Sequence, residues 1–234
     1  MILVKPSVEI IDIMGTGFEN QNPLELIEIA GRTCYKSEEK MTDTSHKEFV
    51  KAILKRGHES VIEHSAMTVK FIVDRGVTHE LVRHRLCAFS QESTRYCNYK
   101  GGVTFVIPPW VDDVESGEYP FHWKDGPLTS NNIGIGFAFV SNDSYHWFWS
   151  MVYAEDNYKK LLQWGWSPQQ ARSVLPNSLK TEIVVTANFR EWRHILKLRT
   201  SKAAHPQMRE VMLMLLERVK KIIPVIFDDI LAES

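Results

Sequence analysis

The stretch Ala66 to Val73 constrains the fold of this chain most, because it carries the clearest β-strand pattern. Apolar residues occupy every odd position from 67 to 73, and a period of two places them on one face of a strand. Such a face has to pack against another layer. The β-branched run Thr181 to Ala187 predicts a second strand. Weaker patterns over Met1 to Ile13 and Val103 to Ile107 predict two more.

Helical periodicity separates these strands. Asn22 followed by Pro23 predicts a helix start, and Thr78 is a candidate N-cap for a short helix over 77–82. Residues 110–140 show no strong period, so we expect a long loop or insertion there. The pattern indicates one α+β domain over residues 1–234. The other expected helices run from Ser45 toward Gly57, from Asp143 to Gln163 with Ser141 or Asn142 as cap, from Ser167 through Arg172, from Asn188 to Leu198, and onward from His205.

Charge and cysteine content narrow the class of protein. The net charge of −1 gives no general attraction to nucleic acid or membrane, so an anion site has to be local. Cys34, Cys87 and Cys97 form no Cys-x-x-Cys pair, which favours a reduced, cytoplasmic setting. The first residues do not resemble a signal peptide, and no apolar run is long enough to span a bilayer.

The chemistry concentrates between Arg83 and Tyr96. Arg83, His84, Arg85 and Arg95 supply the cations of this stretch, and arginine offers a rigid fork of donors suited to phosphate and carboxylate. Such a segment can wrap an anion from two sides. Basic residues also favour helix C-termini, so the same cluster can be a structural cap.

A second polar stretch runs from His58 to His64. It superficially resembles a zinc-protease motif, but that motif needs histidines four residues apart on one helix face. His58 and His64 are six apart, on opposite sides of a helix. We therefore expect no metal site, and a polar turn leading into a strand stays open as the structural alternative.

Arg83-His84-Arg85 followed by seven residues and Ser93 resembles the signature of the flavin-dependent thymidylate synthases, and Arg95-Tyr96 fits the same pattern. The resemblance covers roughly residues 58 to 210, in which the family motifs occur in order. The further matches are the His-Glu-Ser-x-x-Glu-His stretch from His58, Ala171-Arg172 with Leu175-Pro176, Asn188-Phe189-Arg190, Leu198-Arg199, and His205 with Gln207.

The resemblance implies reductive methylation of dUMP to dTMP. FAD would carry the hydride, with NADPH and 5,10-methylenetetrahydrofolate as co-substrates. It also implies a mainly antiparallel, twisted sheet packed with helices, in a homotetramer with shared active sites that binds neither nucleic acid nor membrane.

The resemblance also assigns roles to single residues. Arg199 is the candidate catalytic residue, since a guanidinium beside the uracil would stabilise developing negative charge. His58 is the candidate for the folate and NADPH face. The candidates for dUMP binding are Glu80, Arg83, Gln91, Glu92, Ser93, Thr94, Arg95, Arg172 and Arg199. The candidates for FAD binding are Ser60, Glu63, Arg83, His84, Arg85, Gln91, Asn188, Phe189, Arg190, His194 and His205.

Two features qualify this assignment. Glu80 replaces a glutamine that we expect in the family, and its carboxylate would repel a phosphate unless a neighbouring arginine neutralises it. Ser93 could instead act as a nucleophile, although no Asp-His pair nearby is evident from the sequence to activate it. No cysteine follows a proline, as the nucleophile of the flavin-free thymidylate synthases does, and we interpret Cys87 as a packing residue.

Two other functions remain open on the residues alone. Phe89, Tyr96 and Tyr99 beside the arginines could stack bases in a non-catalytic nucleotide- or RNA-binding protein. Alternatively, the chain could be a structural scaffold whose cations are helix caps.

Overall fold

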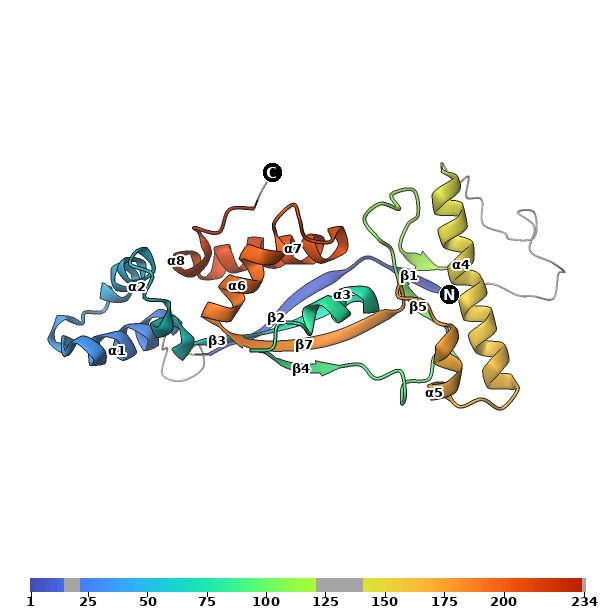
Figure 1. Ribbon diagram of the computed structural model, residues 1–234, viewed down its shortest axis with the longest axis horizontal. Helices are drawn as coiled ribbons and strands as arrows, with labels where there is room; N and C mark the ends of the chain where they lie inside the picture. Colours follow the sequence, from blue (N-terminus) through green and yellow to red (C-terminus); the bar gives the residue numbers. More distant parts are fainter. Residues whose placement is uncertain (15–21, 121–140, 233–234) are drawn as a thin grey trace. The chain divides into compact units, whose positions relative to one another are not determined.

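A computed structural model describes residues 1–14, 22–120 and 141–232 of the chain. The chain forms two compact units (Figure 1). The first unit contains residues 1–6, 72–79 and 91–182, and the second contains residues 7–71, 80–90 and 183–234. Both units are therefore assembled from interleaved stretches, and the single domain expected from the sequence stays a prediction.

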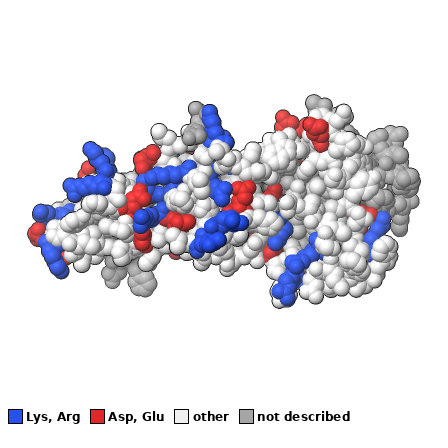
Figure 2. Space-filling view, in the orientation of Figure 1, with Lys and Arg blue, Asp and Glu red and all other residues white. Residues whose placement is uncertain are grey.

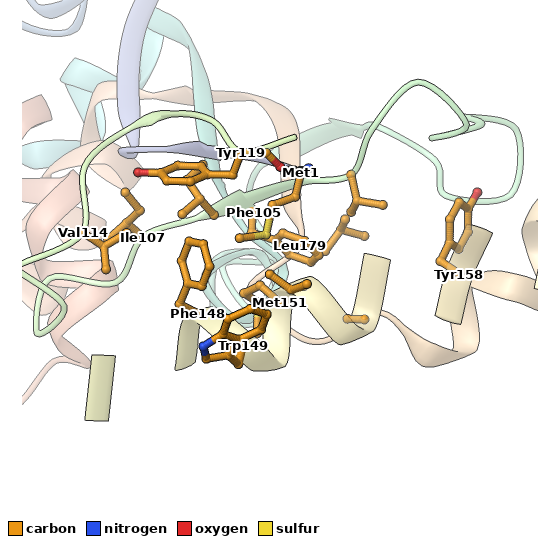
Figure 3. Close-up of a cluster of buried hydrophobic side chains, with 14 of the residues drawn as sticks. Met1, Phe105, Ile107, Val114, Tyr119, Phe148, Trp149, Met151, Tyr158 and Leu179 are labelled. Carbon is orange, nitrogen blue, oxygen red and sulfur yellow. Dashed lines mark hydrogen bonds between the residues drawn. The ribbon is translucent and has the colours of Figure 1, made fainter. Parts of the chain in front are cut away.

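The first unit is built around a three-stranded sheet. Strand β1 (Ile2–Val4) lies in its centre, parallel to β5 (Thr104–Val106) and antiparallel to β6 (Gly117–Glu118). The long helix α4 (Asn142–Gln163) packs against this sheet through a buried apolar cluster (Figure 3). Figure 3 shows Phe148 and Met151 from α4 facing Met1 and Phe105.

A capping serine fixes the start of α4, and buried aromatic residues fix the face that packs. Ser141 caps it, and its Oγ accepts from the backbone N–H of Ser144 at 3.1 Å, which confirms the predicted helix start. Aromatic residues of α4 lie on both its buried and its exposed faces. Phe148 and Trp149 are buried, whereas Tyr145 and Tyr153 are exposed by 39% and 46%. The short helix α5 (Pro168–Ala171) and the 3₁₀ turn η4 (Arg172–Val174) follow.

The second unit contains most of the four-stranded sheet, whose strands lie in the order β2-β3-β7-β4. The strands are β2 (Ser7–Ile13), β3 (Ala66–Asp74), β7 (Lys180–Asn188) and β4 (Ala88–Gln91). The hydroxyl groups of Thr68 and Thr186 are hydrogen-bonded to each other, and the N–H of Phe189 donates to the Ser65 carbonyl. Strands β3 and β7 therefore run antiparallel. Both strands alternate buried and half-buried residues as predicted.

Helices cover one face of this sheet in the second unit (Figure 1). Helix α6 (Phe189–Arg199) is fixed on β3 by Trp192, whose indole N–H donates to the Met67 carbonyl at 2.9 Å. Helix α7 (Pro206–Ile222) lies against β2, and α8 (Pro224–Phe227) follows it. The remaining helical elements are α1 (Pro23–Tyr35), η1 (Glu38–Lys40), α2 (Ser45–Lys55) and η2 (Glu59–His64). The α+β prediction is thus confirmed.

The start of helix α3 (Arg75–Leu81) differs from the prediction. Thr78 is not its N-cap but an interior residue whose hydroxyl donates to the Arg75 carbonyl. Asp74 takes the capping role, because its Oδ1 accepts from the N–H of Val77 at 2.7 Å. The helix therefore begins where β3 ends.

Two strand predictions were also incomplete. The expected strand over Met1 to Ile13 is broken at Pro6, which separates β1 from β2. Strand β4, which the sequence did not predict, lies within the stretch from Arg83 to Tyr96. In the expected loop over 110–140, Val111, Val114 and Tyr119 are buried in the cluster of the first unit, and residues 121–140 lie outside the described residues.

No helix within the described ranges is long and apolar enough to cross a membrane.

Candidate active site

The guanidinium group of Arg199 is held on two sides in the second unit. Its Nε donates to Nε2 of His84 at 3.0 Å, and its Nη1 donates to a carboxylate oxygen of Glu80 at 2.9 Å. Nη2 donates to the Glu80 carbonyl at 3.4 Å. A guanidinium has five N–H groups, so these three bonds fix its plane and leave donors for a ligand. The Arg199 side chain is 17% exposed and hence accessible.

His84 is the buried partner in this arrangement, with a relative exposure of 6%. Its Nδ1 lies 3.8 Å from a carboxylate oxygen of Glu191, and its ring lies edge-on to that of His194 at 6.0 Å. Burial, and then the charges of Arg199 and His194, lower the pKa of His84 to about 4. The ring is therefore neutral at pH 7, as Nε2 must be to accept from Arg199.

Glu80 has the neutralising arginine that its carboxylate needs. Its pairing with Arg199 removes the repulsion that a bare carboxylate would exert on a phosphate. Its contact with dUMP stays a prediction.

A cavity of about 740 Å³ opens in the second unit. Four predicted flavin residues line it: Glu63, Asn188, Arg190 and His194. Arg190 pairs with Glu63 at 2.6 Å, and Asn188 caps α6 through the N–H of Glu191 at 2.9 Å. Arg190, Lys197 and His194 give this wall donors for phosphate oxygens, so its chemistry fits a flavin dinucleotide.

Arg193 and Lys197 also line the cavity, and neither was predicted from the sequence. Arg193 is 2% exposed and forms a two-pronged pair with Asp229 at 2.6 and 2.7 Å. It also donates to Glu59 at 3.3 Å and to the Ile226 carbonyl. The spacing of Arg193 from Phe189 and Leu196 places it on the buried face of α6. This spacing could have predicted from the sequence that Arg193 is buried.

Gln91 and Glu92 belong to the first unit, and both are held by neighbours. The amide nitrogen of Gln91 donates to Thr78 at 3.0 Å and to Thr181 at 3.3 Å. Glu92 accepts from the Tyr99 hydroxyl at 2.8 Å and from Lys180 at 3.1 Å. Burial and then the bond to Glu92 raise the pKa of Tyr99, which keeps its hydroxyl protonated. Tyr99 and Lys180 were not predicted as site residues.

Ser93, Thr94 and Arg95 form a turn in the first unit. The Ser93 carbonyl accepts from the N–H groups of Tyr96 at 3.2 Å and Cys97 at 2.9 Å. Thr94 is buried, and its hydroxyl accepts from Arg172 at 2.9 Å. The structure therefore joins two motifs that lie 78 residues apart.

The remaining predicted residues are placed as follows. Arg83 and Arg85 are exposed on either side of His84, and Ser60 and His205 are also exposed. Phe189 is fully buried against Phe227, so a flavin contact there would come from its backbone. His58 is exposed, and its Nδ1 lies 3.0 Å from the Tyr35 hydroxyl.

Two further observations concern reactivity. Burial, and then Glu191, raise the pKa of Cys87 to about 12, so this thiol stays protonated at neutral pH. Within residues 1–14, 22–120 and 141–232, no three His, Cys, Asp or Glu side chains are placed to hold a metal ion. On the face shown in Figure 2, basic and acidic side chains lie beside one another instead of forming a patch of one sign.

Solved structures share this fold. A UMP/dUMP methylase of Streptomyces cacaoi, solved with 5-Br dUMP, has a TM-score of 0.72 at 23% identity, covering 97% of this chain and 96% of that one. Thymidylate synthase X of Helicobacter pylori, solved with FAD and dUMP, has a TM-score of 0.71 at 24% identity, covering 97% and 100%.

Sequence comparison identifies the family. The model of the family described as thymidylate synthase complementing protein matches residues 17–225. The flavin-dependent thymidylate synthase of Corynebacterium efficiens is 33% identical over 89% of this chain and 80% of its own length. That of Mycobacterium avium is 34% identical over 87% and 78%. The chain belongs to the family of the flavin-dependent thymidylate synthases.

Proposed function

We propose that this protein is a flavin-dependent thymidylate synthase that methylates dUMP reductively to dTMP, with FAD, NADPH and 5,10-methylenetetrahydrofolate. Family membership supports the reaction class. The observation that carries the proposal in this chain is the guanidinium of Arg199, held by Glu80 and His84 with donors left for a ligand.

Arg199 would activate the uracil ring. The C5 carbon of the base becomes nucleophilic when negative charge builds up on the pyrimidine, before it attacks the incoming one-carbon unit. A guanidinium fixed before the reaction stabilises that charge without reorganisation in the transition state. The bonds to Glu80 and His84 supply this fixed geometry.

FAD would be held in the second unit by Glu63, Asn188, Arg190 and His194 along the cavity, with Ser60, Arg83, Arg85 and His205 as further candidates. When bound, FAD supplies the hydride. Arg190 and Lys197 would pair with phosphate oxygens, and His84 would act on this site through Arg199. The backbone of Phe189 completes the predicted set in the second unit, and Gln91, in the first unit, stays a prediction from the family resemblance.

The dUMP phosphate would bind at the Ser93–Arg95 turn. Arg172 beside Thr94, and Arg95, would neutralise it. The Glu92 carboxylate would repel the phosphate less, because Lys180 pairs with that carboxylate at 3.1 Å. Ser93 would bind the dUMP phosphate and would not act as a nucleophile.

We further propose a cytoplasmic homotetramer with shared active sites, and His58 as a contact on the folate and NADPH face. The family resemblance supports the assembly, and the three free cysteines support a reducing compartment. The bond from Tyr35 would orient His58.

The test uses the purified full chain. We expect a yellow protein whose flavin absorbance bleaches with NADPH and returns in air. Tritium release from C5-labelled dUMP should need flavin and folate together. A colourless protein that ignores dUMP but binds RNA with a steep salt dependence would instead support the nucleic-acid alternative.

A further inference from the structure

A buried carboxylate in the second unit has no part in the reaction proposed above. Glu191 is 8% exposed and lies in the first turn of α6. A buried carboxylate costs free energy unless a partner compensates it. In α1 the residue at the same helix position, Glu25, accepts from the backbone of its cap, Asn22. The Glu191 carboxylate instead lies 3.8 Å from Nδ1 of His84.

The role of the Glu191 carboxylate follows from the other ring nitrogen of His84, Nε2. Nε2 of His84 accepts from Nε of Arg199 at 3.0 Å. Arginine has only donors at Nε, so Nε2 must carry a lone pair. The neutral ring therefore has its proton on Nδ1, on the side of Glu191. In histidine, the partner of one nitrogen sets the protonation of the other.

We propose that Glu191 is a positioning residue for Arg199. Its carboxylate favours the proton of His84 on Nδ1, which keeps Nε2 free to accept from Arg199 and keeps the guanidinium in one orientation. The distance of 3.8 Å makes this an electrostatic preference rather than a full hydrogen bond. The effect on turnover rests on the proposed function, whereas the tautomer itself does not.

The surrounding charges agree with this role. The groups facing the His84 ring are Arg199, Glu191 and His194, with Glu80 beyond Arg199. Arg199 repels a proton at Nε2, and Glu191 attracts one at Nδ1. Both charges therefore favour the same tautomer.

A double-mutant cycle tests the kinetic consequence. Glu191→Gln removes the charge at nearly constant shape, and we expect kcat per bound flavin to fall about tenfold to hundredfold, the usual range for a residue that orients a functional histidine. In a His84→Gln background, where no tautomer exists, the same change should have no further effect. An equal loss in both backgrounds, or no loss in the first, would overturn the proposal.

Glu28→Gln is the matched control. Glu28 is a carboxylate of the same unit, 1% exposed, that accepts from Arg32 and Ser45. Its loss should lower thermal stability and leave kcat per bound flavin unchanged. A loss of kcat equal to that of Glu191→Gln would assign both effects to general destabilisation.

A second measurement needs no substrate. Nitrogen NMR of the full chain labelled with ¹⁵N-histidine, with His84 assigned by its absence in His84→Gln, reports the tautomer at pH 7. We expect the Nδ1–H form, and a mixture with Nε2–H in Glu191→Gln. An Nε2–H or doubly protonated ring in the wild type would overturn the inference. If the wild type made no dTMP yet showed the expected tautomers, the proposed function would fall and the role of Glu191 would stand.

Discussion

At the scale of single residues, carboxylates pair with three arginines around the candidate site of the second unit. Glu80 pairs with Arg199, Glu63 with Arg190, and Asp229 with Arg193. Arg193 is buried, whereas Arg190 is 53% exposed and pairs at a solvated surface. An exposed pair adds little stability, so we assign the Arg190–Glu63 pair to the cavity wall it lines rather than to folding.

Arg199→Lys tests the geometry of the guanidinium while keeping its charge. A lysine ammonium is a point charge and cannot reproduce the fork that meets Glu80 and His84 together. We expect turnover to fall about 10²- to 10³-fold with flavin still bound, the cost of losing one fixed donor in an active site. Steady-state kinetics with the flavin content measured checks this.

The control is Arg218→Lys in the same unit, where the arginine donates to the Val8 carbonyl. This variant should keep full turnover. Arg199→Lys at wild-type rate would contradict the assigned role.

Lys180→Met tests how Glu92 is tolerated beside a phosphate. Without Lys180, the Glu92 carboxylate keeps the Tyr99 bond but loses the cation that pairs with it. We expect the Kd for dUMP to rise about tenfold, the effect of roughly 1.4 kcal/mol, measured by calorimetry. Adding Glu92→Gln should restore most of the affinity.

Lys159→Met is the matched control, because Lys159 pairs with Glu155 in α4. Equal weakening of dUMP binding in this variant would show that the loss at Lys180 is not specific.

At the scale of elements, the helix caps make a graded test of local stability. Asn22 accepts from the N–H of Leu24 at 2.9 Å and forms a capping box with Glu25 at the start of α1. Asn22→Ala should lower the free energy of unfolding by about 1 kcal/mol, measured by urea denaturation. Thr44 holds the same position in α2 without a side-chain capping bond, so Thr44→Ala should have almost no effect. Equal losses would contradict this account of capping.

The elements also show what the sequence could predict. The cap at Asn22 and the alternation of β3 are local patterns, and the structure confirms both. The start of α3 was misplaced because Thr78 was predicted as the cap, whereas Asp74, four residues earlier, accepts the capping bond. Strand β4 lies beside β7, and its last residue precedes Glu92, whose N–H donates to Glu182 some 90 positions away. Such pairing has no local signature.

The candidate site likewise combines residues that sequence motifs predict with residues that only tertiary contacts bring to it. Arg199, His84 and Arg172 could be assigned from motifs, and the structure gives each a polar partner. The partners of His84 and Glu92, which are Glu191 for the first and Lys180 and Tyr99 for the second, were missed because their roles arise only from tertiary contacts.

At the scale of the whole molecule, His84 predicts a dependence of stability on pH. Its pKa is about 4 in the folded chain against 6.5 in the unfolded one, so the unfolded state binds more protons between these values. Stability must therefore fall as the pH drops from 6.5 toward 4. Between pH 7 and pH 4.5 we expect a loss on the order of 2 kcal/mol from this group.

Urea denaturation of wild type and His84→Gln at both pH values isolates the contribution of His84, because the other titrating groups are common to the two proteins. The glutamine side chain of the variant does not titrate, so that variant should lose less stability on acidification. Parallel losses would contradict the lowered pKa.

The most direct test of the central claim is the product itself. The purified chain, with FAD, NADPH, 5,10-methylenetetrahydrofolate and dUMP, should form dTMP detectable by mass spectrometry, and omitting NADPH, the folate or dUMP, or removing the bound flavin, should prevent it. Arg199→Ala should bind FAD and form no dTMP. A wild-type protein that binds FAD and dUMP and oxidises NADPH, yet forms no dTMP, would contradict the account.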